Sequence, residues 1–407
     1  MKSANSLRLS IIFLSTYPPR QCGIATFTSN LVQSVSMAPG RPRLNIIAVT
    51  DRAGSYRYGE YVVMEIERDN RRGYERAADS INNSPYDIVC VQHEFGIFGG
   101  EDGDYLLDFL GRVRKPVVTT LHTILAEPDM HKVELMRAVA RKSALLVAML
   151  RKGIDILEEG YGIPRRKSVF IPHGIPAIRA RSRQEIRRSL ALGERPTIAT
   201  FGLINPGKGI EYMIMAMPQI VNYIPDALYL VLGKTHPEVK KRYGESYRES
   251  LVKLAHDLGV GNNVRFVDEY LTERELVEYL LACDVYVTPY VSREQITSGT
   301  LAYAIGLGKA IVSTRYYYAE EMLAGGRGLL VDFRNPGELA EAVVTILTSN
   351  DLRMRLERST SLLGSNMSWP KVGQIYAKLF ADVAARSGRV TRVGEQTLTL
   401  GQKSSVR

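Results

Sequence analysis

The 407-residue sequence has only three cysteines, and none of them forms a Cys-x-x-Cys pair. A disulfide scaffold and a zinc ribbon are therefore excluded. The chain also lacks any run of about 18 apolar residues, the length needed to span a bilayer. Its opening segment has neither a long apolar stretch nor a small-residue cleavage site. We therefore expect a cytoplasmic protein without a signal peptide.

Several motifs that carry well-known chemistry are missing as well. The six histidines include no His-Glu-x-x-His pair, and no Gly-x-Ser-x-Gly elbow or Cys–His arrangement is present. Zinc-peptidase and covalent acyl chemistry thus have no support, and the sequence requires no metal. Basic residues are dispersed and no nucleic-acid recognition motif occurs, which argues against a nucleic-acid partner.

Positive charge is in excess, with 53 Lys and Arg residues against 43 Asp and Glu, a formal net charge of +10. Such an excess suits an anionic partner, for example a phosphorylated small molecule, and it permits peripheral contact with an anionic membrane. No amphipathic membrane anchor is evident. The alternative is that the scattered charges only keep the protein in solution.

The pattern of apolar segments predicts an α/β fold with two domains. The length exceeds what one hydrophobic core usually supports. In both halves, continuous apolar runs of strand length, such as LSIIFLS and PTIATFG, alternate with helical patterns. This is typical of parallel, doubly wound sheets. The segment IPHGIPAIRARSRQ predicts a hinge between residues 1–176 and 177–370, and the polar stretch 387–407 predicts a disordered tail. Helices are expected near 210–223, 247–258, 273–282, 299–306 and 337–349.

Ligands of open α/β sheets bind beyond the carboxyl ends of the strands, which directs attention to the segment GLINPGKG. It fits Gly-x4-Gly-Lys, but Gly209 stands where a phosphate-binding loop of nucleotide triphosphatases needs Ser or Thr, and Pro206 removes an N–H donor. What remains is Lys208 at the start of a predicted helix, a place that favours a phosphate. The alternative is a solvated surface lysine.

Two further segments place hydroxyl or glycine residues at the start of a predicted helix. Ser298, Gly299 and Thr300 open one helical pattern, so hydroxyls and backbone N–H groups converge there. Ordinary N-capping without a ligand is the alternative. Gly23 lies similarly in a turn after the first strand.

Histidines and one carboxylate complete the candidate groups. His122 and His93 follow predicted strands, and His173 lies in the hinge, so each is a candidate for the site or, alternatively, a packing residue. Glu294 is the carboxylate closest to the second anion-binding segment. His131, His236 and His256 are expected at the surface or in packing contacts.

Taken together in this order, the segments STYPPRQCGIATF, HTILAEPD, IPHGI, FGLINPGKGIEYMI, NVRFVDEYLTERELVEYLLACDVYVTPY and SGTLAYAIGLGKAIVST resemble a known family. The chain is similar, from about Leu9 to Leu379, to the retaining nucleotide-sugar glycosyltransferases of family 4, and most of all to their mannosyltransferase-like branch. The resemblance implies the GT-B architecture, in which two Rossmann-like domains face each other across a cleft. It also implies that the final helix, 371–386, packs back on the first domain.

The same resemblance implies a hexose transfer, most simply of mannose, from a nucleotide-diphosphate sugar such as GDP-mannose or a UDP-hexose to a glycan or glycolipid. No separate cofactor or metal is implied. Catalytic roles would fall to His122, Lys208 and Glu294, and the acceptor side would include His93 and His122. Donor-binding roles would fall to Gly23, Gly202, Lys208, Glu269, Tyr270, Gln295, Ser298, Gly299 and Thr300.

The sequence departs from the family pattern at three positions. Gln295 and Tyr303 stand where two glutamates are usual, and Leu203 replaces a common arginine. Arg20 and Arg293 are therefore candidates to share the diphosphate charge with Lys208. These departures keep two alternatives open, a catalytically silent GT-B module that binds a sugar or a partner, and an epimerase that acts on nucleotide sugars.

Overall fold

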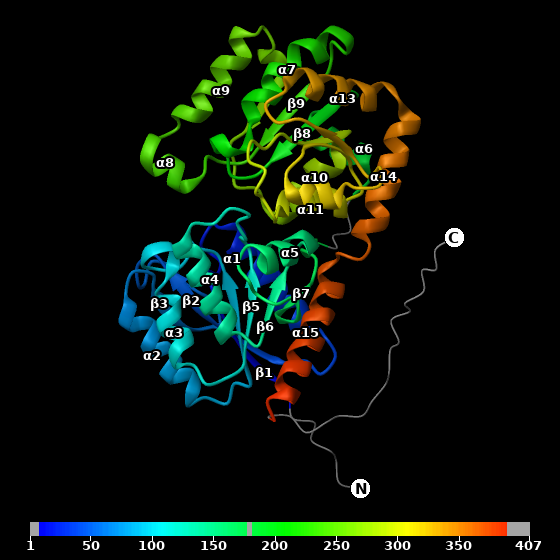
Figure 1. Ribbon diagram of the computed structural model, residues 1–407. Helices are drawn as coiled ribbons and strands as arrows, with labels where there is room; N and C mark the ends of the chain where they lie inside the picture. Colours follow the sequence, from blue (N-terminus) through cyan, green and yellow to red (C-terminus); the bar gives the residue numbers. More distant parts are fainter. Residues whose placement is uncertain (1–7, 177–180, 389–407) are drawn as a thin grey trace, which may run out of the picture.

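Two parallel β-sheets, one in each half of the chain, organise the computed structural model, which describes residues 8–176 and 181–388 (Figure 1). The first sheet has seven strands in the order β3-β2-β1-β4-β5-β6-β7, and the second has six in the order β10-β9-β8-β11-β12-β13. In both sheets the strand order reverses beside the first strand, at β1/β4 and at β8/β11. The predicted α/β class with two Rossmann-like domains is confirmed.

The first domain alternates strands and helices, except that its third strand follows the second directly. Its elements are β1 (Ser10–Ser15), α1 (Gly23–Ser36), β2 (Arg43–Thr50), β3 (Val62–Glu67), α2 (Arg71–Asn82), β4 (Ile88–His93), α3 (Leu106–Arg112), β5 (Val117–Leu121), α4 (Met130–Lys142), β6 (Leu145–Ala148), α5 (Arg151–Glu159) and β7 (Ser168–Phe170).

The second domain repeats the pattern and ends in three successive helices. Its elements are α6 (Arg183–Ser189), β8 (Thr197–Phe201), α7 (Ile210–Tyr223), β9 (Leu228–Leu232), α8 (Pro237–Tyr243), α9 (Ser246–Asp257), β10 (Val264–Val267), α10 (Glu273–Ala282), β11 (Val285–Thr288), α11 (Gly299–Gly306), β12 (Ala310–Thr314), α12 (Tyr317–Met322), β13 (Leu329–Val331), α13 (Pro336–Thr348), α14 (Asn350–Gly364) and α15 (Trp369–Arg386).

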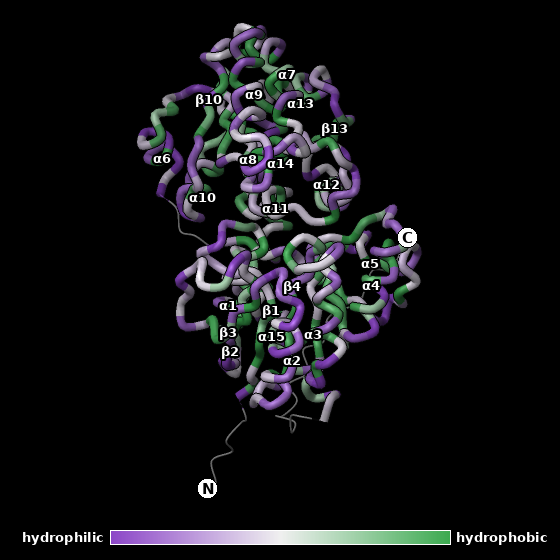
Figure 2. The backbone as a smooth tube through the Cα atoms, turned by 90° about the vertical axis from the view of Figure 1, so that its left-hand side faces the viewer, coloured by the Kyte–Doolittle hydropathy of each residue, from purple (hydrophilic) through white to green (hydrophobic). Residues whose placement is uncertain are grey.

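The central strands are buried and mostly apolar because helices cover both faces of each sheet (Figure 2). All residues of β1, β4, β5, β9 and β12 are buried. The predicted helices 210–223, 273–282 and 299–306 are confirmed as α7, α10 and α11, and the other two are displaced by one residue at each end.

Helix α15 lies on the first domain, although it follows the second in sequence (Figure 1). Val372, Tyr376 and Phe380 are buried in one core with Phe13 of β1 and Val32 of α1. The rings of Phe13 and Phe380 meet edge to face, with centroids 6.1 Å apart. Residues 389–407, which make up nearly all of the predicted disordered tail, lie outside the described residues.

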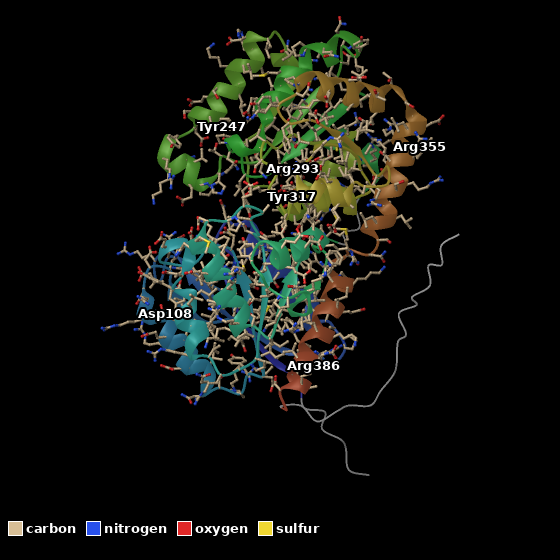
Figure 3. The ribbon with its side chains drawn as sticks, viewed as in Figure 1. Asp108, Tyr247, Arg293, Tyr317, Arg355 and Arg386 are labelled. Carbon is tan, nitrogen blue, oxygen red and sulfur yellow. The ribbon has the colours of Figure 1, made fainter. Side chains whose placement is uncertain are left out.

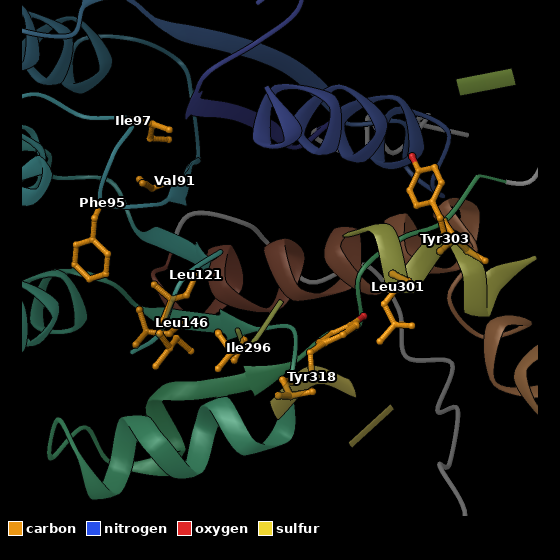
Figure 4. Packing of buried hydrophobic residues seen from close by; sticks show 14 of the residues in the cluster. Val91, Phe95, Ile97, Leu121, Leu146, Ile296, Leu301, Tyr303 and Tyr318 are labelled. Carbon is orange, nitrogen blue, oxygen red and sulfur yellow. The ribbon is translucent and has the colours of Figure 1, made fainter. Parts of the chain in front are cut away.

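The two domains also share an apolar contact. Ile296 of the second domain is buried in the same cluster as Leu121 and Leu146 of the first (Figure 4). Beside it, both oxygens of the Glu321 carboxylate, on α12, accept hydrogen bonds from the first two N–H groups of α5, at 3.0 and 2.9 Å. Across the described residues, no helix is both long and apolar enough to cross a membrane.

Candidate functional site

A cavity of about 720 Å³ lies between the two domains, where the carboxyl ends of β1 and β8 face each other. The lining includes residues that follow strand ends in both sheets, as expected for ligand sites of doubly wound sheets. The first domain contributes the turn after β1 and one face of α1, and the second contributes the turns after β8, β9 and β10. The predicted site residues that line it are Gly23, Gly202, Lys208, Glu269, Tyr270, Gly299 and Thr300.

Local backbone geometry places Lys208 at this cavity. The side chain of Asn205 accepts a hydrogen bond from the N–H of Gly207 at 2.9 Å and fixes a short 3₁₀ turn over Pro206–Lys208. Gly209 then has φ +62°, and a Cβ atom there would lie 2.0 Å from the carbonyl oxygen of Pro289. Only glycine permits both the turn and this close approach, so Lys208 is held beside the end of β11.

A chain of hydrogen bonds connects Lys208 with the start of α11. The Lys208 ammonium donates to the Tyr290 hydroxyl at 2.7 Å. The Tyr290 hydroxyl is in turn 2.6 Å from Oγ1 of Thr300, which lies 3.1 Å from Oγ of Ser298. The two anion-binding segments found in the sequence are therefore parts of one site. Tyr290, which joins them, was not a predicted site residue.

The N-terminus of α11 is capped and still has free donors. The Ser298 hydroxyl accepts from the N–H of Leu301 at 3.2 Å, which is ordinary N-capping. Within the described residues, however, no protein group accepts from the N–H groups of Gly299 and Thr300. These two donors, the Thr300 hydroxyl and the Lys208 ammonium together form a site that suits a phosphate.

Besides Lys208, two basic residues line the cavity, and one basic residue that was a candidate does not. Arg20 lines the cavity, but it forms an ion pair with Asp51 at 3.0 Å. Arg293 does not line the cavity; it lies beside Tyr317, 5.4 Å from the ring centroid (Figure 3). Lys234, in the turn after β9, is exposed and lines the cavity, and it was not predicted. The lining residues thus include three basic side chains, Lys208, Lys234 and Arg20.

The turn after β1 brings the start of α1 to the same cavity. Cys22 is the N-cap residue and provides no side-chain cap, and the first turn of α1 contains no acidic residue. Gly23 lines the cavity, and a Cβ atom there would find nothing within 4 Å. The partial positive charge of this helix end therefore faces the cavity from the first domain.

Aromatic rings form the floor where the domains meet. Phe27 of α1 contacts His122, His173 and Trp369 edge to face, with centroids 4.8, 5.1 and 5.1 Å apart. His122 Nε2 bonds Gln92 Oε1 at 2.9 Å, so Nε2 carries the hydrogen and Nδ1 is left as an acceptor. Burial lowers the pKa of His122 to about 3, with smaller effects from His173 and His93. His122 is therefore a neutral hydrogen-bond acceptor rather than an acid; it contacts Phe27, which lines the cavity, but is not itself a lining residue.

Five predicted site residues are not among the cavity-lining residues: His93, His122, Glu294, Gln295 and Ser298. His93 is buried under Phe95 and Phe98 in the core of the first domain, where burial lowers its pKa to about 4. Glu294 and Gln295 lie in the loop before α11 and are not among the lining residues, and the Gln295 amide bonds the Thr297 carbonyl at 3.0 Å. Their site roles stay predictions.

A carboxylate that the sequence analysis did not identify does line the cavity. Glu273, the first residue of α10, accepts hydrogen bonds on Oε1 from the Asn30 amide at 2.9 Å and the Tyr303 hydroxyl at 2.6 Å. Asn30 belongs to α1, so this contact joins the two domains across the cavity. Within the described residues, no group of three or more potential ligands is arranged to hold a metal ion.

Several known proteins are similar to this chain. Residues 182–361 match the family described as Glycosyl transferases group 1. Over 201 residues, 46% of this chain and 49% of the other, the protein is 28% identical to a GDP-mannose-dependent α-(1-6)-phosphatidylinositol monomannoside mannosyltransferase of Mycobacterium tuberculosis. Over 321 residues, 73% of this chain and 71% of the other, it is 25% identical to a D-inositol 3-phosphate glycosyltransferase of Corynebacterium efficiens. The match to the mannosyltransferase thus spans about half of that relative.

Solved structures share the fold over nearly the whole chain. HepE from Anabaena, in complex with UDP and glucose, has a TM-score of 0.73 at 16% identity, with 92% of this chain and 100% of that chain covered. A sucrose-phosphate synthase from Thermosynechococcus elongatus has a TM-score of 0.75 at 14% identity, with 93% and 100% covered. The protein has the GT-B fold, as the sequence predicted. Most of its second domain, residues 182–361, matches the model of the glycosyl transferases group 1 family.

Proposed function

We propose that the protein is a glycosyltransferase that takes a nucleotide-diphosphate sugar as its donor. The observation that carries the proposal is the convergence of Lys208, the free N–H groups of Gly299 and Thr300, and the uncapped start of α1 on one cavity between the domains. A diphosphate is the ligand that such an arrangement of positive charge and donors suits best.

Similarity to relatives supports a narrower assignment. The mannosyltransferase relative depends on GDP-mannose, and HepE was solved with UDP and glucose. We propose transfer of a hexose, with mannose from GDP-mannose as the first candidate, to a hydroxyl group of a glycan or glycolipid. Glu269 and Tyr270 would lie against the base, and His122 would accept a hydrogen bond from the sugar or the acceptor.

The proposed reaction retains the anomeric configuration. The bond between the anomeric carbon and the diphosphate oxygen breaks, and a new bond forms on the same face between that carbon and the acceptor oxygen. The acceptor proton passes to the departing diphosphate. In this scheme Lys208 and the α11 donors stabilise the negative charge that grows on the leaving group, and the cavity walls hold the two substrates in place.

Nucleotide binding and turnover together test the proposal. UDP, GDP, UDP-glucose and GDP-mannose should be screened by thermal shift, because a ligand of the folded state raises the melting temperature. Lys208→Met should weaken binding of the active nucleotide by about 10- to 100-fold, the range for a lost charge-assisted hydrogen bond. Lys253→Met is the matched control, since Lys253 pairs with Asp257 on α9 and does not line the cavity.

Product analysis separates transfer from the alternatives. A transferase releases nucleoside diphosphate in an acceptor-dependent way, whereas an epimerase changes the sugar of the donor in the absence of an acceptor. A silent binding module shows a thermal shift with neither product. Absence of any shift with all four nucleotides would refute the assignment.

A further inference from the structure

Glu273 has an unusual pattern of hydrogen bonds for a carboxylate that lines a cavity. Both of its partners, the Asn30 amide and the Tyr303 hydroxyl, bond the same oxygen, Oε1. No group within the described residues bonds Oε2. One oxygen is therefore fixed by protein, and the other is left as a free acceptor at a half-buried position of the cavity wall.

The two partners hold the carboxylate firmly. Tyr303 is buried on α11, and Figure 4 shows its hydroxyl pointing toward α1. Burial, together with the adjacent Glu273 carboxylate, raises the pKa of the phenol, so Tyr303 stays protonated and donates. Asn30 approaches from the first domain. The free oxygen of Glu273 is thus positioned by both walls of the cavity at once.

A carboxylate oxygen in such a place has a limited choice of partners. A phosphate would repel it, whereas hydroxyl groups donate to it, and a charge-assisted O–H···O⁻ bond is about twice as strong as a neutral one. The phosphate-binding groups, Lys208 and the start of α11, contact neither Glu273 oxygen. The cavity therefore has a cationic part for the diphosphate and a separate acceptor for hydroxyl groups.

We propose that Glu273 is a specificity-determining residue, whose free oxygen accepts hydrogen bonds from neighbouring hydroxyl groups of the bound nucleotide sugar. Asn30 and Tyr303 are positioning residues that hold the carboxylate for this contact. The inference rests on the proposed function, because it takes the ligand to be a nucleotide sugar. The hydroxyl pair belongs either to the ribose or to the transferred hexose.

Glu273→Gln tests this contact with little change in shape. The glutamine oxygen can still accept from Asn30 and Tyr303, while the free oxygen becomes an NH₂ group that only donates. Tyr303→Phe is a second variant, which leaves the carboxylate in place and removes one of its two anchors. Glu321→Gln is the matched control, since Glu321 also joins the two domains but does not line the cavity.

Dissociation constants of UDP, GDP, their 2′-deoxy forms, UDP-glucose and GDP-mannose would be measured by calorimetry for each variant. We expect Glu273→Gln to weaken binding about tenfold, Tyr303→Phe to weaken it less, and Glu321→Gln to leave it within twofold. If the hydroxyl groups belong to the ribose, the variant affects the plain nucleotides and the effect shrinks for the 2′-deoxy forms. If they belong to the hexose, the variant affects only the nucleotide sugars.

Three results would overturn the inference. Unchanged affinity of Glu273→Gln for every ligand would refute it and leave the proposed function intact. An equal loss in Glu321→Gln would show that domain docking, not the free oxygen, is responsible. Failure of the unaltered protein to bind any of these nucleotides would refute the proposed function, and the inference with it. Thermal unfolding of each variant shows whether the fold is retained.

Discussion

Lys208 and Thr300 share one partner, the phenol of Tyr290, which lies 2.7 Å from the ammonium and 2.6 Å from the hydroxyl. The ammonium also lies 4.1 Å from the centroid of the Tyr290 ring, so the ring face and the hydroxyl both restrain it. Tyr290 is itself buried and stacks on Tyr316, with centroids 5.0 Å apart. A rigid aromatic side chain thus positions the cation relative to the start of α11.

Tyr290→Phe should therefore weaken nucleotide binding without disturbing the fold. The phenyl ring keeps the stacking on Tyr316, but the hydroxyl that links Lys208 to Thr300 is lost. We expect a three- to tenfold rise in the dissociation constant of the nucleotide that binds best, the cost of about one hydrogen bond. Calorimetric titration measures it. In a Lys208→Met background the same change should have little further effect, and full additivity would contradict the coupling.

Gly23 offers a test of the first domain's contribution. Since a Cβ atom at this position finds nothing within 4 Å, Gly23→Ala should change the free energy of unfolding by less than about 1 kcal/mol. The added methyl group would nevertheless stand at the start of α1, where an anion would approach the N–H groups. We expect several-fold weaker nucleotide binding, measured by the same titration.

Gly209→Ala provides the contrasting control for Gly23→Ala. A Cβ atom at residue 209 meets a backbone oxygen, so this variant should lose stability as well as binding. If Gly23→Ala bound the nucleotide as tightly as the unaltered protein, Gly23 would not approach the ligand.

The sequence predicted the buried sheet better than the site. Central strands such as β1 and β9 appear as continuous apolar runs because both faces of the sheet are covered. Edge strand β3 forms no such run, because its burial alternates and Glu65 and Glu67 stand among its apolar residues. The loops after β8 and before α11 were identified because ligand sites follow strand ends.

The missed site residues share a physical reason. Glu273 begins a helix with an ordinary capping box at Thr272, and nothing in the local pattern distinguishes it from a solvated first-turn carboxylate. Only the contact with Asn30, 243 residues away in the chain, places it at the cavity. Conversely, His93 follows the expected strand, but the loop after β4 folds over it with Phe95 and Phe98 and buries it.

Buried histidines predict an acid-sensitive stability. Burial lowers the pKa of both His93 and His173 to about 4, well below the value of about 6.5 in an unfolded chain. As pH falls from 6.5 toward 4, the unfolded state binds protons that the folded state does not. The free energy of unfolding should therefore fall, by up to about 1.4 kcal/mol per pH unit for each histidine.

Urea unfolding at several pH values between 7.5 and 4.5 measures this dependence. His93→Leu should reduce the slope of stability against pH in this range, because it removes one of the three rings, His93, His122 and His173, whose pKa burial lowers. His256→Gln is the control, since the His256 side chain is 89% exposed. A slope unchanged in His93→Leu would contradict the assignment of the acid sensitivity to this buried ring.

Glu321 provides the most direct test of how the domains are held together. Its two carboxylate oxygens accept from the N–H groups of Arg151 and Lys152, so a residue of α12 caps the start of α5 in the other domain. Removal of a helix cap costs about 1–2 kcal/mol, and a negative charge at a helix start adds to the effect. Glu321→Ala should lower the free energy of unfolding by that amount.

The neighbouring residue provides the control for Glu321→Ala. Glu320 pairs with the exposed Arg293 at 3.8 Å, and such surface pairs contribute little, so Glu320→Ala should have an effect below about 0.5 kcal/mol. Hydrogen exchange locates the change, because the amides of Arg151 and Lys152 should exchange faster only in Glu321→Ala. Equal losses of stability in both variants, with no difference in exchange at these two amides, would show that the carboxylate does not hold α5 to the second domain.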